Sequence, residues 1–192
     1  MIHRLTLPLA SSHAGLRGAL LRYGMMERLA ECAKRQQVQL LAFGLSASEV
    51  RLVLEGPTVE VTRMVRAFKT GSTRAATARG VELSWESTVR TRVRQDGLLG
   101  AVAWAHRCPV DGGAAGPLAS PWSSHRDLLA FRQAAFYDAS ILEGRVDPRR
   151  VHRLAGGRPL PKGWPPPAGE RESLSTLLRV AAAVLGVLPA NR

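Results

Sequence analysis

The feature that most constrains the fold is a pair of short apolar segments with almost nothing between them. Residues 38–43 have the sequence VQLLAF, and residues 46–56 have the sequence SASEVRLVLEG. In the second segment, large apolar side chains occupy every other position from Val50 to Leu54, and this period of two predicts a strand. The turn between the segments is short and contains Gly44, so the two strands are expected to form an antiparallel hairpin.

The rest of the chain alternates between strand patterns and the longer period of helices. Leucines at alternate positions of LTLPL (5–9) predict a first strand, since this run is shorter than the apolar core of a signal peptide. Helical spacing predicts helices over 15–37, from Pro57 onward and over 97–106, with an extended segment over 85–93. The resulting order predicts a small α+β domain with helices on one face of the sheet.

The sequence changes in character beyond this domain, which we expect to cover residues 1–131. Residues 132–171 are expected to form an extension and a linker rich in proline and glycine, GGRPLPKGWPPPAGERES. Residues 172–192 carry apolar side chains at intervals of three or four and follow the pattern of an amphipathic helix, with Ser173 as a suitable N-cap. Such a helix must dock on the main domain or on a partner.

Charge is the strongest compositional constraint on the partner. The formal net charge is +12 and the isoelectric point is near 11.3. A basic excess of this size attracts polyanions, because each phosphate contact releases condensed counterions. Nucleic acid is therefore the first partner to consider. A merely basic domain is the alternative, since nearly all of the positive charge is arginine.

The location of the protein is predicted from two further features. No apolar run approaches the roughly 20 residues that cross a bilayer, so no membrane partner is expected. Cys32 and Cys108 lie far apart and lack the spacing of metal ligands. Together these features predict a cytoplasmic protein with reduced thiols.

Four segments resemble one family of DNA-processing enzymes. They are ALLRYGMMERLAECAKRQQVQLLAFGLSASEVRLVLEG, TVEVTRMVRAFKTGSTRAATARG, VAWAHRCPV and SPWSSHRDLL. In this order and spacing, the chain resembles the single-tyrosine HUH transposases. The nearest group is the REP-associated tyrosine transposases, relatives of the insertion sequence 200 type. The resemblance covers residues 1–131 and implies a ferredoxin-like fold, in which helices pack on an antiparallel sheet.

The resemblance also implies where the chemistry of such enzymes takes place. They hold Mg²⁺ or Mn²⁺ with two histidines at alternate strand positions, and a helical tyrosine attacks the scissile phosphate. A side-chain amide one turn after the tyrosine commonly helps to hold the metal. In this sequence, the four positions are occupied by Glu49, Arg51, Trp104 and Cys108.

These four residues cannot perform that reaction. Arginine does not coordinate a metal ion, and an indole has no hydroxyl that can form a phosphate ester. Alternate strand positions share a face, so we expect Glu49 to pair with Arg51, and Arg51 to occupy the place of the metal and face DNA phosphate. The sequence therefore predicts no cleavage activity, no metal and no other cofactor.

No other residue restores the chemistry at the level of sequence. His106 remains from the nucleophile motif without an evident partner, and ligand-like spacing is absent among His3, His13, His125 and His152. Tyr23 and Tyr137 are interpreted as ordinary half-buried aromatic residues. An active transposase with an unorthodox nucleophile is kept as an alternative.

DNA binding is the activity that such a chain can retain. Residues 63–107 contain nine basic and three acidic residues. The candidate phosphate contacts are Arg63, Arg66, Lys69, Arg74, Arg90, Arg92, Arg94 and Arg107. We expect a monomer or homodimer that prefers single-stranded or hairpin DNA, a preference that the resemblance alone implies. A protein-interaction module that uses the C-terminal helix is the other alternative.

Overall fold

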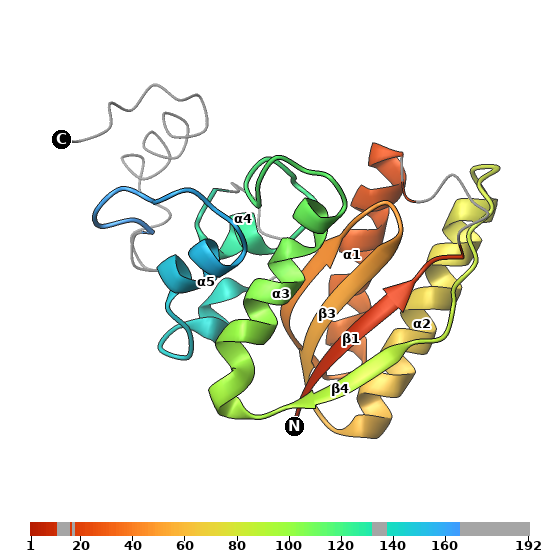
Figure 1. The fold of residues 1–192 in the computed structure, drawn as a ribbon. Coiled ribbons are helices and arrows are strands. Elements are labelled where there is room, and N and C mark those ends of the chain that lie inside the picture. The colour runs from red at the N-terminus through yellow and green to blue at the C-terminus, as the bar shows by residue number, and fades with distance from the viewer. Residues whose placement is uncertain (11–15, 17, 132–137, 166–192) are drawn as a thin grey trace.

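The structure contains the predicted elements in the predicted order. The computed structural model describes residues 1–10, 16, 18–131 and 138–165. Its elements are β1 (Ile2–Pro8), α1 (Ala19–Arg35), β2 (Gln39–Leu45), β3 (Glu49–Glu55), α2 (Thr58–Thr77), β4 (Val89–Val93), η1 (Gln95–Gly97), α3 (Leu98–Asp111), α4 (His125–Leu128), η2 (Ala139–Leu142) and α5 (Pro148–Leu154) (Figure 1). The C-terminal helix predicted at 172–192, His13 and Tyr137 lie outside the described residues.

The sheet has the expected fold. All pairings between neighbouring strands are antiparallel, in the order β2-β3-β1-β4. Because α1 connects β1 to β2 and α2 connects β3 to β4, this is the split βαβ arrangement of ferredoxin-like domains. The prediction of an α+β fold with a ferredoxin-like antiparallel sheet is therefore confirmed.

Helices cover both faces of the sheet, which corrects the expectation that they cover one. α1 and α2 pack on one face, where Leu5, Phe43 and Phe68 belong to the same buried cluster. α3 packs on the opposite face of β2 and β3, where Leu41 and Val53 meet it, and leaves β1 and β4 more open (Figure 1). Both faces need cover because β2 is buried from Leu40 to Leu45, a pattern of strands enclosed on two sides.

The segment that contains Trp122 and Ser124 closes the outer edge of β2. The Leu45 amide donates to the Trp122 carbonyl at 2.7 Å, and the Ser124 amide donates to the Phe43 carbonyl at 3.0 Å. An open strand edge is thereby paired, whereas β4 forms the other edge of the sheet. The SPWSS motif thus has a structural role in this fold.

Residues 138–165 pack on the α3 side of the molecule. Leu142, Val146 and Val151 belong to the buried cluster that lies beneath α3. The sequence analysis placed this segment in an extension and linker outside the domain. Across the described residues, no helix is both long enough and apolar enough to span a membrane.

Candidate functional site

The fold brings together the four positions to which the resemblance in sequence assigned reactive residues. Glu49 and Arg51 project from β3 toward α3, and Trp104 and Cys108 lie one turn apart on α3. Arg51 Nη1 donates to the Trp104 carbonyl at 3.2 Å, and Cys108 Sγ lies 3.8 Å from the Glu49 carbonyl oxygen. We call this group, together with Asp111, the Arg51 cluster.

A glycine on β2 allows α3 to approach this closely. A Cβ atom at Gly44 would collide with the Ala105 carbonyl oxygen and lie 2.8 Å from the Cβ of Cys108. Gly44 faces Arg51 across the sheet, in register. The sequence predicted Gly44 in the turn of the hairpin, but β2 continues to Leu45 and residues 46–48 connect it to β3. As a residue of β2, Gly44 sets the distance between the sheet and the helix at the site.

Arg51 is held from both sides by carboxylates. Its Nε lies 2.7 Å from Glu49 Oε1, and its Nη1 lies 2.6 Å from Asp111 Oδ2. The Arg51 side chain is only 12% exposed. Burial lowers the pKa of Arg51, but the hydrogen bond to Asp111 and the neighbouring charges raise it above its ordinary value overall. The guanidinium is therefore a fixed cation.

This geometry does not support the expectation that Arg51 faces DNA phosphate. Its donors already serve Glu49, Asp111 and the carbonyl of Trp104. Asp111 also accepts from Arg107 Nε at 2.9 Å, and these two arginine contacts outweigh burial and hold the pKa of its carboxyl below the ordinary value. The Arg51 cluster is thus a closed set of ion pairs.

The remaining members of the cluster, Trp104 and Cys108, are unreactive as nucleophiles. Trp104 lies between two cations, with the Arg4 guanidinium 4.4 Å and the Arg51 guanidinium 5.1 Å from its ring centroid. Cys108 is fully buried, and this burial raises the pKa of its thiol to about 12. A thiol in that state is a poor nucleophile at neutral pH.

Six of the eight residues predicted to contact DNA lie on α2 before its last turn or at β4, and the other two are Arg74 and Arg107. Arg90 Nη2 donates to Thr62 Oγ1 of α2 at 3.0 Å, and Lys69 Nζ donates to the Glu86 carbonyl at 2.9 Å. These bonds join the edge strand β4 and the segment before it to α2. Lys69 and Arg90 therefore lie at this junction. We use the name basic edge for these two together with the other predicted residues before the last turn of α2 and on or just after β4: Arg63, Arg66, Arg92 and Arg94. Arg74 lies in the last turn of α2, and Arg107 belongs to α3, where it pairs with Asp111.

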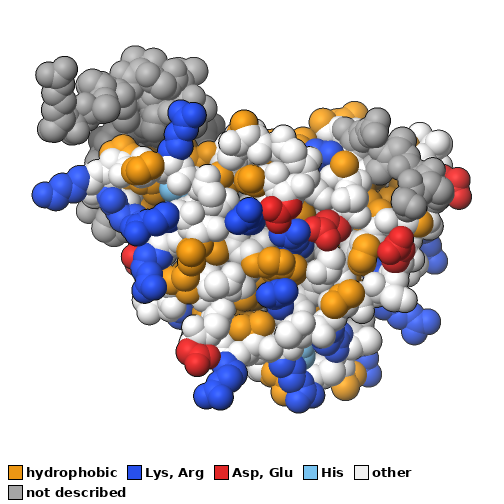
Figure 2. Space-filling model, viewed as in Figure 1, with side chains coloured by type: hydrophobic (Ala, Val, Ile, Leu, Met, Phe, Trp, Pro, Cys, Tyr) orange, Lys and Arg blue, Asp and Glu red, His pale blue; other side chains and the backbone are white. Residues whose placement is uncertain are grey.

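Most arginines of the basic edge are open to solvent. Arg63, Arg66 and Arg92 are exposed, and in the described part of the chain they form no salt bridge. Arg94 lies just past the end of β4 with its side chain 92% exposed and a loose 3.8 Å contact to Asp96. Figure 2 shows basic side chains along the lower edge of the face that includes β4, and further basic side chains over α5.

The structure reveals one group that sequence reasoning missed. The interpretation of His106 as a histidine without a partner is wrong: its Nε2 lies 2.8 Å from Ser124 Oγ and its Nδ1 lies 2.9 Å from His125 Nδ1. His125 in turn meets His152 at 2.7 Å. No spacing rule could find this chain, because its members come from three different helices. Within the described residues, no group of three or more His, Cys, Asp or Glu side chains, these histidines included, is arranged so that it could hold a metal ion.

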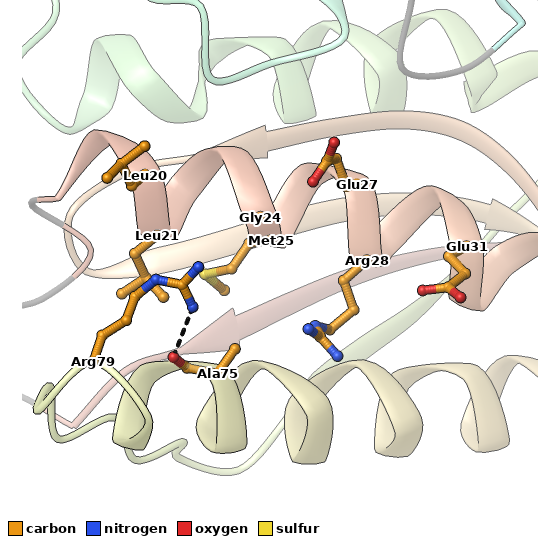
Figure 3. A pocket seen from close by; sticks show the side chains of 9 residues that line it. All are labelled: Leu20, Leu21, Gly24, Met25, Glu27, Arg28, Glu31, Ala75 and Arg79. Atoms are coloured by element: carbon orange, nitrogen blue, oxygen red, sulfur yellow. Dashed lines mark hydrogen bonds between the residues drawn. The ribbon is translucent and has the colours of Figure 1, made fainter.

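Two hollows lie near the surface, the first away from these groups and the second beside the three histidines. A groove of about 200 Å³ between α1 and α2 is lined by Leu20, Leu21, Gly24, Met25, Glu27, Arg28, Glu31, Ala75 and Arg79 (Figure 3). In it, Arg28 points between the helices and Arg79 Nη1 donates to the Ala75 carbonyl at 3.0 Å. A larger cavity of about 620 Å³ lies between the 115–119 loop and residues 156–161, and His152 forms part of its wall.

Comparisons with known proteins give similarity in structure alone. No protein-family model matches the chain, and no curated protein resembles it at a significant level. A REP-associated tyrosine transposase bound to a REP hairpin is similar with a TM-score of 0.46 and 17% identity, over 66% of this chain and 78% of that one. A candidate transposase from Deinococcus radiodurans R1 is similar with a TM-score of 0.41 and 17% identity, over 57% of this chain and 91% of that one.

Proposed function

We propose that this protein binds DNA through the basic edge and does not cleave it. The observation that carries the proposal is the set of exposed arginines on two adjoining elements, α2 and the end of β4. Guanidinium groups that project from a rigid helix and strand suit the repeating charge of a phosphate backbone. The partner is nucleic acid rather than a small anion, because the charges spread along an edge instead of converging in a pocket.

The proposed lack of cleavage is supported by the Arg51 cluster. A nucleophile must reach the phosphorus atom, and Trp104 offers no hydroxyl while the Cys108 thiol is buried. Glu49 is committed to Arg51 at 2.7 Å and would have to exchange that partner for a metal ion. We therefore propose DNA binding that needs neither Mg²⁺ nor Mn²⁺. The proposed preference for single-stranded or hairpin DNA rests only on the resemblance of the sequence to the transposases.

A binding titration tests this function. Fluorescent hairpin, single-stranded and duplex DNA would be titrated at several salt concentrations, with Mn²⁺ or with a chelator. The test variant is Arg66→Ala/Arg92→Ala, and the matched control is Arg35→Ala. Arg35 is also exposed, but it pairs with Glu31 on α1, away from the basic edge.

The expected result is tight, salt-dependent binding that ignores the metal and leaves the DNA uncut. The slope of log K against log salt is negative, and each lost phosphate contact makes it less steep by about 0.7–0.9. The slope of the double variant should therefore be less steep than that of the wild type by about 1.4–1.8. The control should keep the slope of the wild type. A covalent protein–DNA adduct would overturn the lack of cleavage. No binding at physiological salt would overturn the DNA-binding proposal and direct the search to a protein partner.

A further inference from the structure

Three buried histidines form one continuous hydrogen-bonded chain. His106 of α3, His125 of α4 and His152 of α5 are all 4% exposed or less. His106 Nδ1 lies 2.9 Å from His125 Nδ1, and His125 Nε2 lies 2.7 Å from His152 Nδ1. Ser124 Oγ ends the chain on the inner side at 2.8 Å, and the carbonyl of Arg158 ends it on the outer side at 2.7 Å. The chain therefore joins α5 to α3 and α4.

The contact between His125 and His152 is a hydrogen bond between ring edges. Their ring planes differ by only 8° and their centroids are 5.0 Å apart. Because the ring planes are nearly parallel, the distance between the planes cannot exceed the 2.7 Å between His125 Nε2 and His152 Nδ1. Most of the 5.0 Å between the centroids therefore lies within the ring planes. The rings meet edge to edge, so that an N–H of one points at a nitrogen of the other. This is favourable geometry for an N–H···N bond.

The ends of the chain fix the proton on every ring. The Arg158 carbonyl can only accept, so His152 carries its proton on Nε2 and accepts at Nδ1. His125 must then donate from Nε2 and accept at Nδ1, and His106 must donate from Nδ1 and accept at Nε2. Ser124 donates to His106 while its oxygen accepts from the Phe43 amide at 2.9 Å. With all three rings neutral, each bond of the chain therefore has one donor and one acceptor. The Ser124 hydroxyl also has the Phe43 carbonyl within 3.3 Å as a second acceptor.

Burial opposes a positive charge on each ring of the chain. Burial lowers the pKa of His106 to about 3, and burial together with the two neighbouring imidazoles lowers the pKa of His125. For His152, burial lowers the pKa more than the hydrogen bond to the Arg158 carbonyl raises it, so the pKa is lowered overall. No carboxylate contributes to these shifts.

The charged groups on the elements around the chain are engaged elsewhere. Arg107 and Asp111 of α3 bind each other, Arg126 of α4 donates to the Leu118 carbonyl, and Arg149 of α5 donates to the Pro161 carbonyl. Asp127 of α4 is buried and has interactions of its own. Arg150 and Arg153 of α5 are exposed.

We propose that this chain is a proton-sensitive latch, which holds residues 138–165 against α3 and α4 and opens when it takes up a proton. His152 is where the proton arrives, because it lines the cavity of about 620 Å³ while His106 and His125 are fully buried. A proton on any of the three rings places a positive charge in a buried site between α3, α4 and α5, and burial disfavours that charge. Opening exposes α5, while the sheet with α1 and α2 stays folded, since residues 138–165 contribute only Ala139 and the partly buried Ile141 to its core. This inference does not depend on the proposed DNA binding.

Nuclear magnetic resonance of the intact protein tests the proton positions directly. At pH 7.5, the ring nitrogens should show His106 protonated at Nδ1, and His125 and His152 protonated at Nε2. A different tautomer on any ring would overturn the proposed chain. This measurement uses the wild type, so it stands even where a variant fails to fold.

Hydrogen exchange of backbone amides tests the latch. The folded pKa of His152 is lowered, so its stabilisation is present above the unfolded pKa of about 6.5 and is lost as pH falls. Between pH 7.5 and pH 5.0, opening of α5 should rise by up to about 30-fold if it frees His152 alone, and up to about a thousandfold if it also frees His125. Amides of β2 and β3 should keep their protection. Equal loss of protection in α5 and the sheet, or no change in α5, would overturn the latch.

Two variants complete the test. His152→Ala should leave α5 unprotected already at pH 7.5 while the sheet stays protected. The matched control is His3→Asn, since His3 is also buried with a lowered pKa but bonds to the Gly56 carbonyl on the other side of the fold. The control should keep the pH dependence of α5. Loss of that dependence in the His3 variant would show that acid acts on the whole fold and not on the latch.

Discussion

Replacing Arg51 with methionine tests whether the Arg51 cluster stabilises the fold. Methionine keeps much of the side-chain volume and removes the guanidinium, so Glu49 loses its partner while Asp111 keeps Arg107. Removing one partner of a fully buried ion pair costs about 3–5 kcal/mol, and of an exposed pair about 0–1 kcal/mol. The Glu49 and Asp111 side chains are 23% and 35% exposed, between these limits. We therefore expect Arg51→Met to lower the free energy of unfolding by about 2–3 kcal/mol.

Urea denaturation at pH 7 measures this loss. With a slope of about 2 kcal/mol per molar urea, the midpoint should fall by about 1 M at an unchanged slope. The matched control is Arg35→Met, which breaks an ion pair of 2.6 Å whose side chains are 72% and 54% exposed. This control should change stability by less than about 0.5 kcal/mol.

The pH dependence gives the same test a second readout. The pKa of Asp111 is lowered from its ordinary value of 3.8, so the stabilisation by its carboxylate is present above that value and is lost as pH falls through the folded pKa. The difference between wild type and Arg51→Met should therefore shrink in acid. A loss no larger than that of Arg35→Met, or a difference that does not shrink in acid, would refute a stabilising role. DNA binding should be unchanged in Arg51→Met, because its donors are occupied within the protein.

Two further outcomes follow from close packing around the site. Gly44→Ala should lower the free energy of unfolding by about 3 kcal/mol or more, since its Cβ meets the backbone of α3, whereas Gly24→Ala should raise it by about 0.5–1 kcal/mol because a Cβ there has no atom within 4 Å. Thermal denaturation compares the two, and equal effects would contradict the packing argument. Neither Cys32 nor Cys108 should react with a thiol reagent at pH 8 until urea is added, because both are buried with raised pKa values; rapid labelling of the native protein would show otherwise.

The fold was predictable because its strands and helices differ in hydrophobic period. The alternating pattern of β3 and the amphipathic face of α2 both follow from side chains that must be buried on one side. The position of α3 was not predictable in the same way. The sequence of α3 predicts a helix but not its place on the sheet. The apolar residues on both faces of β2 require a second layer of helices on the sheet. The pattern within one strand does not indicate which helix forms that layer.

The candidate site was predictable in its composition and not in its contacts. The sequence alone shows that Trp104 and Arg51 cannot serve as a nucleophile and a metal ligand, because that depends on the atoms of the side chains. The direction of the Arg51 guanidinium depends on Asp111, a residue at the far end of α3 that no local pattern connects to β3.

The sequence by itself determined the order of the elements, the basic character and the residue types at the four candidate positions Glu49, Arg51, Trp104 and Cys108. Each of these depends on residue type or on spacing within one segment. Tertiary structure alone decided which side chains meet: the carboxylates around Arg51, the basic edge formed by α2 and β4, and the three histidines from three helices. Hydrogen bonds and ion pairs form over a few ångströms, and only packing brings residues from distant parts of the chain within that range.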